Sequence, residues 1–170
     1  MARRRVKCRV TGEKGYNDKF YRDESGKYYK SEEVYLSYKY ECQARKRAIS
    51  IIADFMGYQP GQPLPAIIKT ELKKLSFYPN STILHTIEKK YDNIVWAVNN
   101  KEFKNDVAKG KYIFAIISNN IADIYRQERR EQLSKELAQK LDNTFEINAL
   151  NDELNQSQDN KDLTSFLDEE

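Results

Sequence analysis

The stretch Lys109-Gly-Lys-Tyr-Ile-Phe-Ala-Ile-Ile-Ser-Asn-Asn-Ile-Ala-Asp-Ile-Tyr125 decides the fold, because it is the most apolar part of this 170-residue chain. Its apolar residues recur every three or four positions, which is the spacing of one face of an α-helix. We expect it to be the central core helix, within a longer helix from about Phe103 to Leu141. Gly110 costs a helix about 1 kcal/mol relative to alanine, so we expect another helix to approach closely there.

The same periodicity predicts three further helices. The first begins at Ser31, whose hydroxyl can cap it, and ends at Gly57. The second runs from Pro65 or Ala66 to about Leu75, and the third from Asn80 or Ser81 to about Asn99. The connector at 58–65 holds three prolines and cannot be helical. The inward face of the first helix is expected to contain Tyr35, Tyr38, Cys42, Arg45, Ile49, Ile52 and Met56.

Residues 5–30 predict a small β unit. Val6, Cys8 and Val10 alternate with basic residues, and short strands are expected at 19–22 and 27–30, with turns at 11–15 and 23–26. A unit of this size is not stable alone, so the first helix is expected to cover it. The predicted fold is therefore α+β: a short N-terminal three-stranded antiparallel β meander packed on a mainly α-helical body of about four helices.

The domain organisation follows from these elements. Residues 1–57 form the β meander with the first helix, 58–65 the proline-rich connector, and 66–141 the helical region. From 142 to 170 Asn, Gln, Asp and Glu dominate. Such a segment buries too little apolar area to offset its chain entropy, so we expect an acidic disordered tail.

Charge is divided along the chain. Residues 1–141 hold 28 Lys and Arg against 17 Asp and Glu, whereas residues 142–170 hold nine acids and one base. A basic body is typical of proteins that bind polyanions, because Lys and Arg displace the counterions condensed on them.

Three groups of residues are candidates for contact with nucleic acid. Bases can contact phosphate, and tyrosines beside them can stack on nucleobases. The alternatives are a solvated terminus, tyrosines that fill a shallow core, and an Arg45 that pairs with Glu41 one helical turn earlier. The candidates are an N-terminal arm of Arg3, Arg4, Arg5, Lys7 and Arg9, the first-helix bases Arg45, Lys46 and Arg47, and a β-unit set of Lys19, Arg22, Tyr21, Tyr28 and Tyr29.

The sequence contains few residues in patterns typical of catalytic or metal sites. It contains no phosphate-binding or zinc-protease motif, and His85 stands alone. Cys8 and Cys42 are too few for a zinc site and are expected to be free thiols. We therefore predict a protein that is not an enzyme and uses no metal or cofactor. No apolar run is long enough for a membrane span and no signal peptide is evident.

The opening Val6-Lys-Cys-Arg-Val-Thr-Gly-Glu13 carries the pattern C-x-V-T-G and leads through a Tyr/Lys-rich stretch to Ser31-Glu-Glu33. This region resembles the start of small accessory proteins of phages of Gram-positive bacteria. Lys111-Tyr-Ile-Phe-Ala-Ile-Ile-Ser-Asn-Asn-Ile121 is similar to a helix of phage replication initiators and helicase loaders. The resemblance implies a phage or prophage accessory protein that acts in the cytoplasm of a bacterial host cell, on nucleic acid or on a host protein.

Two functional hypotheses follow. In the first, the protein binds DNA or RNA through its basic arm and helix face, and the acidic tail competes with nucleic acid for the basic body. In the second, it is an inhibitor or adaptor that blocks a host protein such as a CRISPR effector, a nuclease or a polymerase. A homodimer through the long helix near residues 126–141 is possible under either hypothesis.

Overall fold

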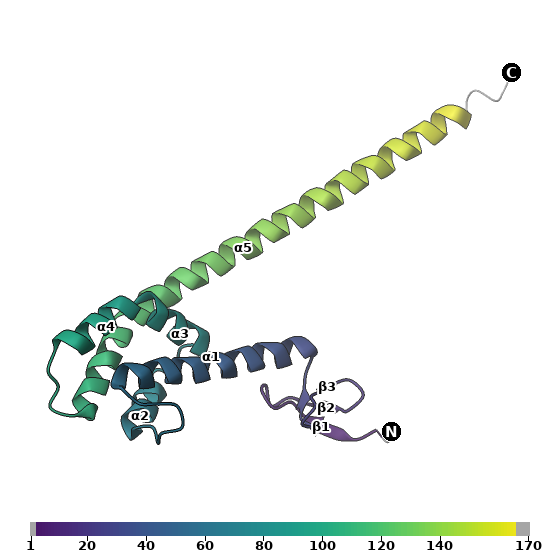
Figure 1. The fold of residues 1–170 in the computed structure, drawn as a ribbon. Helices are drawn as coiled ribbons and strands as arrows, with labels where there is room; N and C mark the ends of the chain where they lie inside the picture. Colours follow the sequence, from purple (N-terminus) through teal and green to yellow (C-terminus); the bar gives the residue numbers. More distant parts are fainter. Residues whose placement is uncertain (1–2, 166–170) are drawn as a thin grey trace. The chain divides into compact units, whose positions relative to one another are not determined.

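The computed structural model of the chain describes the backbone of residues 3–165 and the side chains of residues 3–141. The chain divides into two units, Met1–Tyr125 and Arg126–Glu170. The α+β class is confirmed, with four short strands and five helices in the described residues (Figure 1). The elements are β1 (Arg5–Lys7), β2 (Lys14–Tyr16), β3 (Tyr21–Arg22), β4 (Tyr28–Tyr29), α1 (Glu32–Met56), α2 (Ala66–Lys74), α3 (Asn80–Lys89), α4 (Tyr91–Asn100) and α5 (Asp106–Ser165).

The β unit consists of two antiparallel hairpins, β1–β2 and β3–β4, and the expected three-stranded meander is wrong. The first strand ends early because the chain turns at Cys8, where the N–H of Gly12 donates to the Cys8 carbonyl at 3.1 Å. Gly12 has φ of 73°, which glycine adopts without steric cost. The chain then returns as β2, whose first two residues were expected to be part of a turn. A backbone hydrogen bond from Arg9 N–H to the Tyr28 carbonyl, at 2.9 Å, links the two hairpins.

Helix α1 begins and ends where the sequence predicts. The hydroxyl of Ser31 accepts a hydrogen bond from the Val34 N–H at 3.4 Å, and Gly57 ends the helix in the left-handed conformation with φ of 87°. Ile52 and Met56 are buried as expected, whereas Arg45 is exposed and the buried stripe also contains Ala44 and Ala48, which were not expected. α1 packs mainly on α3, and these small alanines allow the two helices to approach closely.

The third predicted helix is two helices, α3 and α4, which meet at Lys90. No proline or glycine marks this break in the sequence. Beyond it, Ile94 and Ala97 of α4 are buried in the core, whereas Tyr91 at the start of α4 is 49% exposed.

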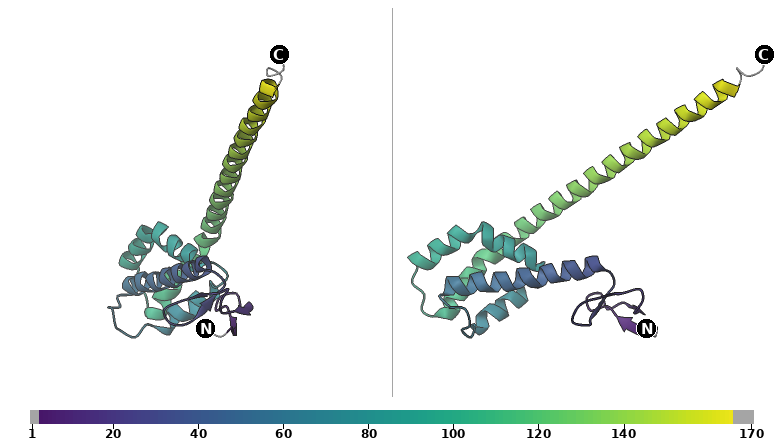
Figure 2. Two further views of the ribbon diagram at one scale, coloured as in Figure 1. Left: turned by 90° about the vertical axis from the view of Figure 1, so that its right-hand side faces the viewer. Right: turned by 45° about the vertical axis from the view of Figure 1, so that its right-hand side comes forward.

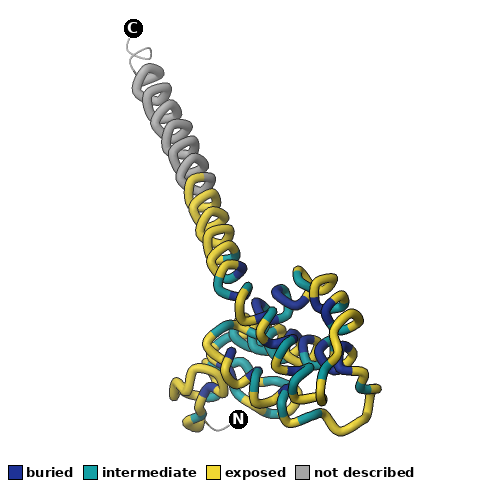
Figure 3. The backbone as a smooth tube through the Cα atoms, turned by 90° about the vertical axis from the view of Figure 1, so that its left-hand side faces the viewer, coloured by how far each residue is buried: buried dark blue, intermediate teal, exposed yellow. Residues whose placement is uncertain are grey.

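The first part of α5 is the central core helix, as predicted. Ile113, Phe114, Ile117 and Ile121 are all buried. The buried positions of the chain gather in the helical body of the first unit (Figure 3). A Cβ atom added to Gly110 would lie 3.0 Å from Ile67 Cγ2, which confirms the close approach of a neighbouring helix. The helix begins at Asp106 rather than near Phe103.

In the second unit, α5 extends to Ser165, so the predicted end near Leu141 is wrong. The segment contains no glycine or proline after Gly110, and nothing local interrupts the helix. Leu133, Leu137 and Leu141 are exposed. The backbone of residues 142–165 is helical, which differs from the disorder predicted for 142–170, and residues 166–170 lie outside the described residues. In the part of the chain that the structure describes, none of the helices has the length and apolar character needed to cross a bilayer.

The N-terminus of α3 is capped by a side chain of another helix. Pro79 precedes α3 and provides no side-chain cap. Instead the carboxylate of Glu41, on α1, accepts hydrogen bonds from the N–H of Asn80 at 2.6 Å, the N–H of Ser81 at 3.4 Å and the hydroxyl of Ser81 at 2.6 Å. The negative charge also lies at the positive end of the helix dipole. Glu41 thus joins α1 to α3 at the start of the helical body.

Replacing Glu41 by alanine leaves these donors without their acceptor, and we expect a loss of about 1–3 kcal/mol in the free energy of unfolding. Urea unfolding followed by circular dichroism measures it. Glu41→Gln keeps one acceptor oxygen and should lose less, and Glu102→Ala, at an exposed loop carboxylate, is the control. Equal effects of Glu41→Ala and Glu102→Ala would show that the cap is not stabilising.

The turn after β1 is built around the sulfur of Cys8, which is 1% exposed. The Thr11 N–H points to this sulfur at 3.4 Å. Burial alone would raise the pKa of the Cys8 thiol, but hydrogen bonds from Thr11, Val10 and Lys30 lower it to about 7, against an ordinary value of 9.0. The folded chain therefore releases the thiol proton more readily than the unfolded chain.

Between pH 7 and pH 9 the unfolded state binds more protons at Cys8 than the folded state, so this group adds stability as the pH rises. We expect the stability advantage of the native protein over Cys8→Ser to grow across this range, by at most about 1.4 kcal/mol per pH unit. Thermal unfolding at several pH values measures it, with Cys42→Ser as the control for loss of a thiol. An advantage that is constant with pH would contradict the assigned pKa.

Candidate nucleic-acid interface

The β1–β2 hairpin is a two-stranded ribbon with two different faces. Its register pairs Arg5 with Tyr16, Val6 with Gly15, and Lys7 with Lys14. Residues directly opposite each other in a ribbon share a face, and successive residues alternate between faces. Arg5, Lys7, Lys14 and Tyr16 therefore lie on one face, and Val6 and Gly15 lie on the other.

Arg3 extends the first of these faces. Its guanidinium carbon lies 4.1 Å from the centre of the Tyr16 ring, and its Nε lies 3.5 Å from the carboxylate of Asp18. Arg5, Lys14, Gly15 and Tyr16 line a hollow of about 290 Å³ at this place. We call Arg3, Arg5, Lys7, Lys14 and Tyr16 the ribbon face.

The charge of the ribbon face is largely uncompensated. Lys7 and Lys14 lie directly opposite each other, and like charges in that position destabilise a strand pair. Among the described residues, Arg5, Lys7 and Lys14 form no ion pair, and Asp18 neutralises only Arg3. An anion placed over this face would remove the repulsion.

The opposite face of the ribbon anchors it to the β3–β4 hairpin. The ring of Phe20 packs so closely on Gly15 that a Cβ atom at that position would clash with it. Arg4 Nη2 donates a hydrogen bond to the Tyr28 hydroxyl at 3.0 Å, and this bond lowers the pKa of Tyr28. Arg4 is thus a structural contact between the two hairpins.

Tyr29 joins the β unit to α1, at whose N-terminal end the unit lies (Figure 2). The ring of Tyr29 is 2% exposed, and its centre is 5.0 Å from that of Tyr35 and 5.9 Å from that of Tyr38. Its hydroxyl donates to the carboxylate of Asp23 at 3.2 Å. Burial, together with this hydrogen bond, raises the pKa of Tyr29.

The three tyrosines predicted to stack on bases have rings that are buried or covered by other side chains of the protein. Tyr29 is buried, and Tyr21 stacks on Tyr35 with ring centres 5.1 Å apart. The ring of Tyr28 has the guanidinium carbons of Arg4 and Arg22 each at 5.8 Å. Here the alternative of a tyrosine-rich shallow core describes the packing better than a stacking platform.

The other predicted bases are placed in two groups. Arg9 lies in the β unit between β1 and β2, with its guanidinium carbon 5.5 Å from the centre of the Tyr38 ring, and Lys19 is exposed. On α1, Arg47 pairs with Glu88 at 2.9 Å, Arg45 donates to Asn80 Oδ1 at 3.4 Å, and Lys46 is exposed. The Glu41 carboxylate, the other partner considered for Arg45, caps α3.

The structure thus brings Arg3, Arg5 and Lys7 together on one face, and it leaves the α1 bases more than a helical turn beyond Tyr38. At 1.5 Å per residue, Lys46 lies about 12 Å along the helix from Tyr38. Contact between the α1 bases and nucleic acid stays a prediction. Sequence reasoning missed Lys14 and Tyr16 as site residues, because it assigned the start of their strand to a turn.

Among the side chains of residues 3–141, no group of three or more His, Cys, Asp or Glu is arranged to hold a metal ion. Comparison of the chain with protein-family models, with curated proteins and with solved structures finds no match. The geometry of the site is therefore the basis on which a function can be argued.

Proposed function

We propose that this protein binds double-stranded nucleic acid through contacts between its ribbon face and the phosphate backbone. The observation that carries the proposal is the register of β1 and β2, which sets Lys7 directly against Lys14 beside Arg5. Such a pair weakens the hairpin unless an anion lies over it. A nucleic-acid backbone supplies anions at regular, close spacing.

Phosphate contact suits this site better than base stacking. A platform for single strands needs aromatic rings that are free to receive bases, whereas the rings of Tyr21, Tyr28 and Tyr29 are buried or covered by other side chains. Double-stranded DNA carries one charge per about 1.7 Å of helix axis, a higher density than a single strand, and its major groove admits a two-stranded ribbon. We therefore expect duplexes to bind more tightly than single strands.

The wider role in this proposal is that of a non-enzymatic phage or prophage accessory protein in the cytoplasm of a bacterial host. The C-x-V-T-G opening supports the phage assignment, and Cys8 and Gly12 of that motif form the turn that sets the ribbon's register. The motif therefore supports binding indirectly, by fixing the geometry of the ribbon. The proposed function needs no cofactor.

Replacing Arg5, Lys7 and Lys14 together by alanine should weaken binding to a short duplex. It should also lower the slope of log K against log salt by about 0.9 for each phosphate that the variant no longer neutralises, or up to about 2.7 for three phosphates. Fluorescence anisotropy over a series of salt concentrations measures both quantities. The stability of the hairpin should not fall, because the Lys7–Lys14 repulsion is removed.

The matched control for this variant is Lys73→Ala/Lys104→Ala/Lys111→Ala, which removes the same charge at exposed positions outside the β unit. The control should keep most of the duplex affinity. Equal losses in the two triple variants would mean that net charge, rather than the ribbon face, determines binding. A native protein that binds neither duplex nor single strand at low salt would contradict the proposed function itself.

Deleting residues 142–170 should tighten duplex binding at low salt, because this segment carries nine acids and one base that compete with phosphate for the basic body. The gain should disappear as salt rises. A full-length variant with its tail acids replaced by Asn and Gln separates the effect of charge from that of length. If neither variant binds more tightly than the native protein, the tail is not a competitor.

A further inference from the structure

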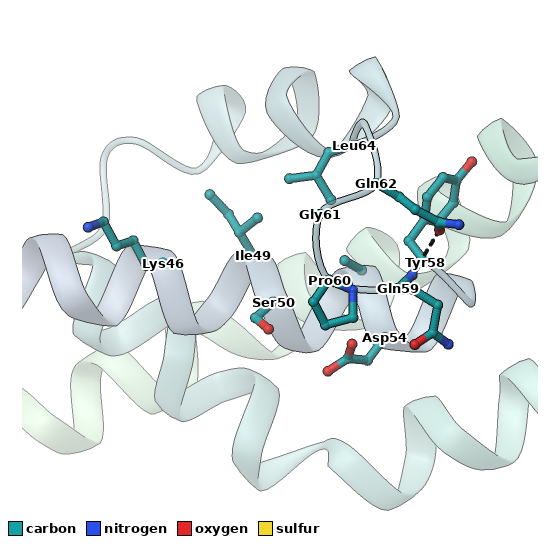
Figure 4. Close-up of a pocket in the computed structure, with 11 residues that line it drawn as sticks. Lys46, Ile49, Ser50, Asp54, Tyr58, Gln59, Pro60, Gly61, Gln62 and Leu64 are labelled. Atoms are coloured by element: carbon teal, nitrogen blue, oxygen red, sulfur yellow. Dashed lines mark hydrogen bonds between the residues drawn. The ribbon is translucent and has the colours of Figure 1, made fainter.

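A second surface, on the helical body, has a different chemistry from the ribbon face. Two adjoining hollows, of about 300 and 230 Å³, share Ile49 of α1 and Leu64 of the connector as lining residues. Ile49 and Leu64 come from different elements and lie beside one hollow in Figure 4, with Lys46 to one side. Ile68 and Leu72 of α2 continue the apolar lining. We call this surface the α1–α2 groove.

The groove combines an apolar floor with a cationic rim. Leu64 is 48% exposed, which is a large exposed fraction for a leucine beside other apolar side chains. Arg45, Lys46 and Lys69 line the groove and are exposed, and they form no ion pair with the described residues. Asp54, at the connector end, is the one acid among the lining residues.

The apolar floor and the cationic rim together indicate which kind of ligand the groove can bind. The apolar floor offers nothing to a phosphate backbone, so nucleic acid does not match it. The hollows are at or below the low end of the roughly 300–1,000 Å³ of small-molecule pockets, so they suit single side chains better than a whole ligand. Apolar side chains flanked by carboxylates match both the floor and the rim.

We propose that the α1–α2 groove binds an acidic amphipathic helix of a partner protein. Apolar residues at one face of that helix would fill the hollows over Ile49 and Leu64, in the manner of other helix-in-groove complexes. Asp and Glu beside them would pair with Arg45, Lys46 and Lys69. This proposal is independent of duplex binding, and it gives the host-protein hypothesis a defined surface.

The test uses the full chain and a fluorescein-labelled helical peptide with leucines at i, i+3, i+4 and i+7 and glutamates beside them. A second peptide has lysines in place of the glutamates. The glutamate peptide should bind saturably and the lysine peptide should not. Lys46→Glu/Lys69→Glu, and separately Leu64→Ser, should each weaken binding by about tenfold or more, which corresponds to about 1.4 kcal/mol.

Two controls make the outcomes decisive. Lys104→Glu/Lys111→Glu changes the same charge outside the groove and should bind the glutamate peptide as the native protein does. The ribbon variant Arg5→Ala/Lys7→Ala/Lys14→Ala should also bind it fully. Leu64 is an exposed residue of the connector. We therefore expect Leu64→Ser to change peptide binding without unfolding the protein.

Several results would overturn the proposal. These are no saturable binding of the glutamate peptide, equal binding of both peptides, and no effect of either groove variant. If a DNA or RNA duplex displaces the peptide from the Arg5→Ala/Lys7→Ala/Lys14→Ala variant, the groove binds nucleic acid instead. Self-association of the native chain that Leu64→Ser abolishes would assign it to a second copy.

Discussion

The packing of the Tyr29 ring against Tyr35 and Tyr38 is the contact on which the position of the ribbon face depends. The β unit has strands of two or three residues and cannot fold alone. Tyr29 is its most buried large side chain, and both of its aromatic neighbours come from the first two turns of α1. Through the hydrogen bond from Arg9 to the Tyr28 carbonyl, the β1–β2 ribbon is attached to this same anchor. α1 therefore serves both parts of the first unit, since its later turns bury Ala48 and Ile52 in the helical core.

Sequence periodicity was sufficient for the elements whose structure depends on local signals. Ser31 caps the start of α1 with a side-chain hydrogen bond, and Gly57 ends the helix with its left-handed backbone conformation. The apolar repeat from Ile113 to Ile124 identified the core helix. The α3–α4 break at Lys90 could not be predicted, because neither a proline nor a glycine marks it in the sequence. Ala44 and Ala48 were missed in the buried stripe of α1, since alanine carries little hydrophobic signal yet allows close helix packing.

The candidate site was found in part. Arg3, Arg5 and Lys7 lie together on one face because residues two apart in a strand share a face. Lys14 and Tyr16 depend on pairing with β1, which follows from the turn at Cys8 and could not be read from periodicity. The tyrosines were a correct sign of a shared aromatic cluster, but their rings pack on each other and on arginines, so their abundance reflects a small core. The two surfaces differ in a way that separates partner classes. The ribbon face has four bases beside a single tyrosine ring, whereas the α1–α2 groove has bases around an apolar floor.

The most direct test of duplex binding by the ribbon face is the pattern of backbone amide chemical-shift changes when the full-length protein is titrated with a short duplex at low salt. We expect the largest changes between Arg3 and Tyr16, at the residues of β1 and β2, and we expect them to reverse when salt is added. Changes that are concentrated on α1 and α2, or spread evenly over the basic surface with none larger at the ribbon, would contradict this assignment.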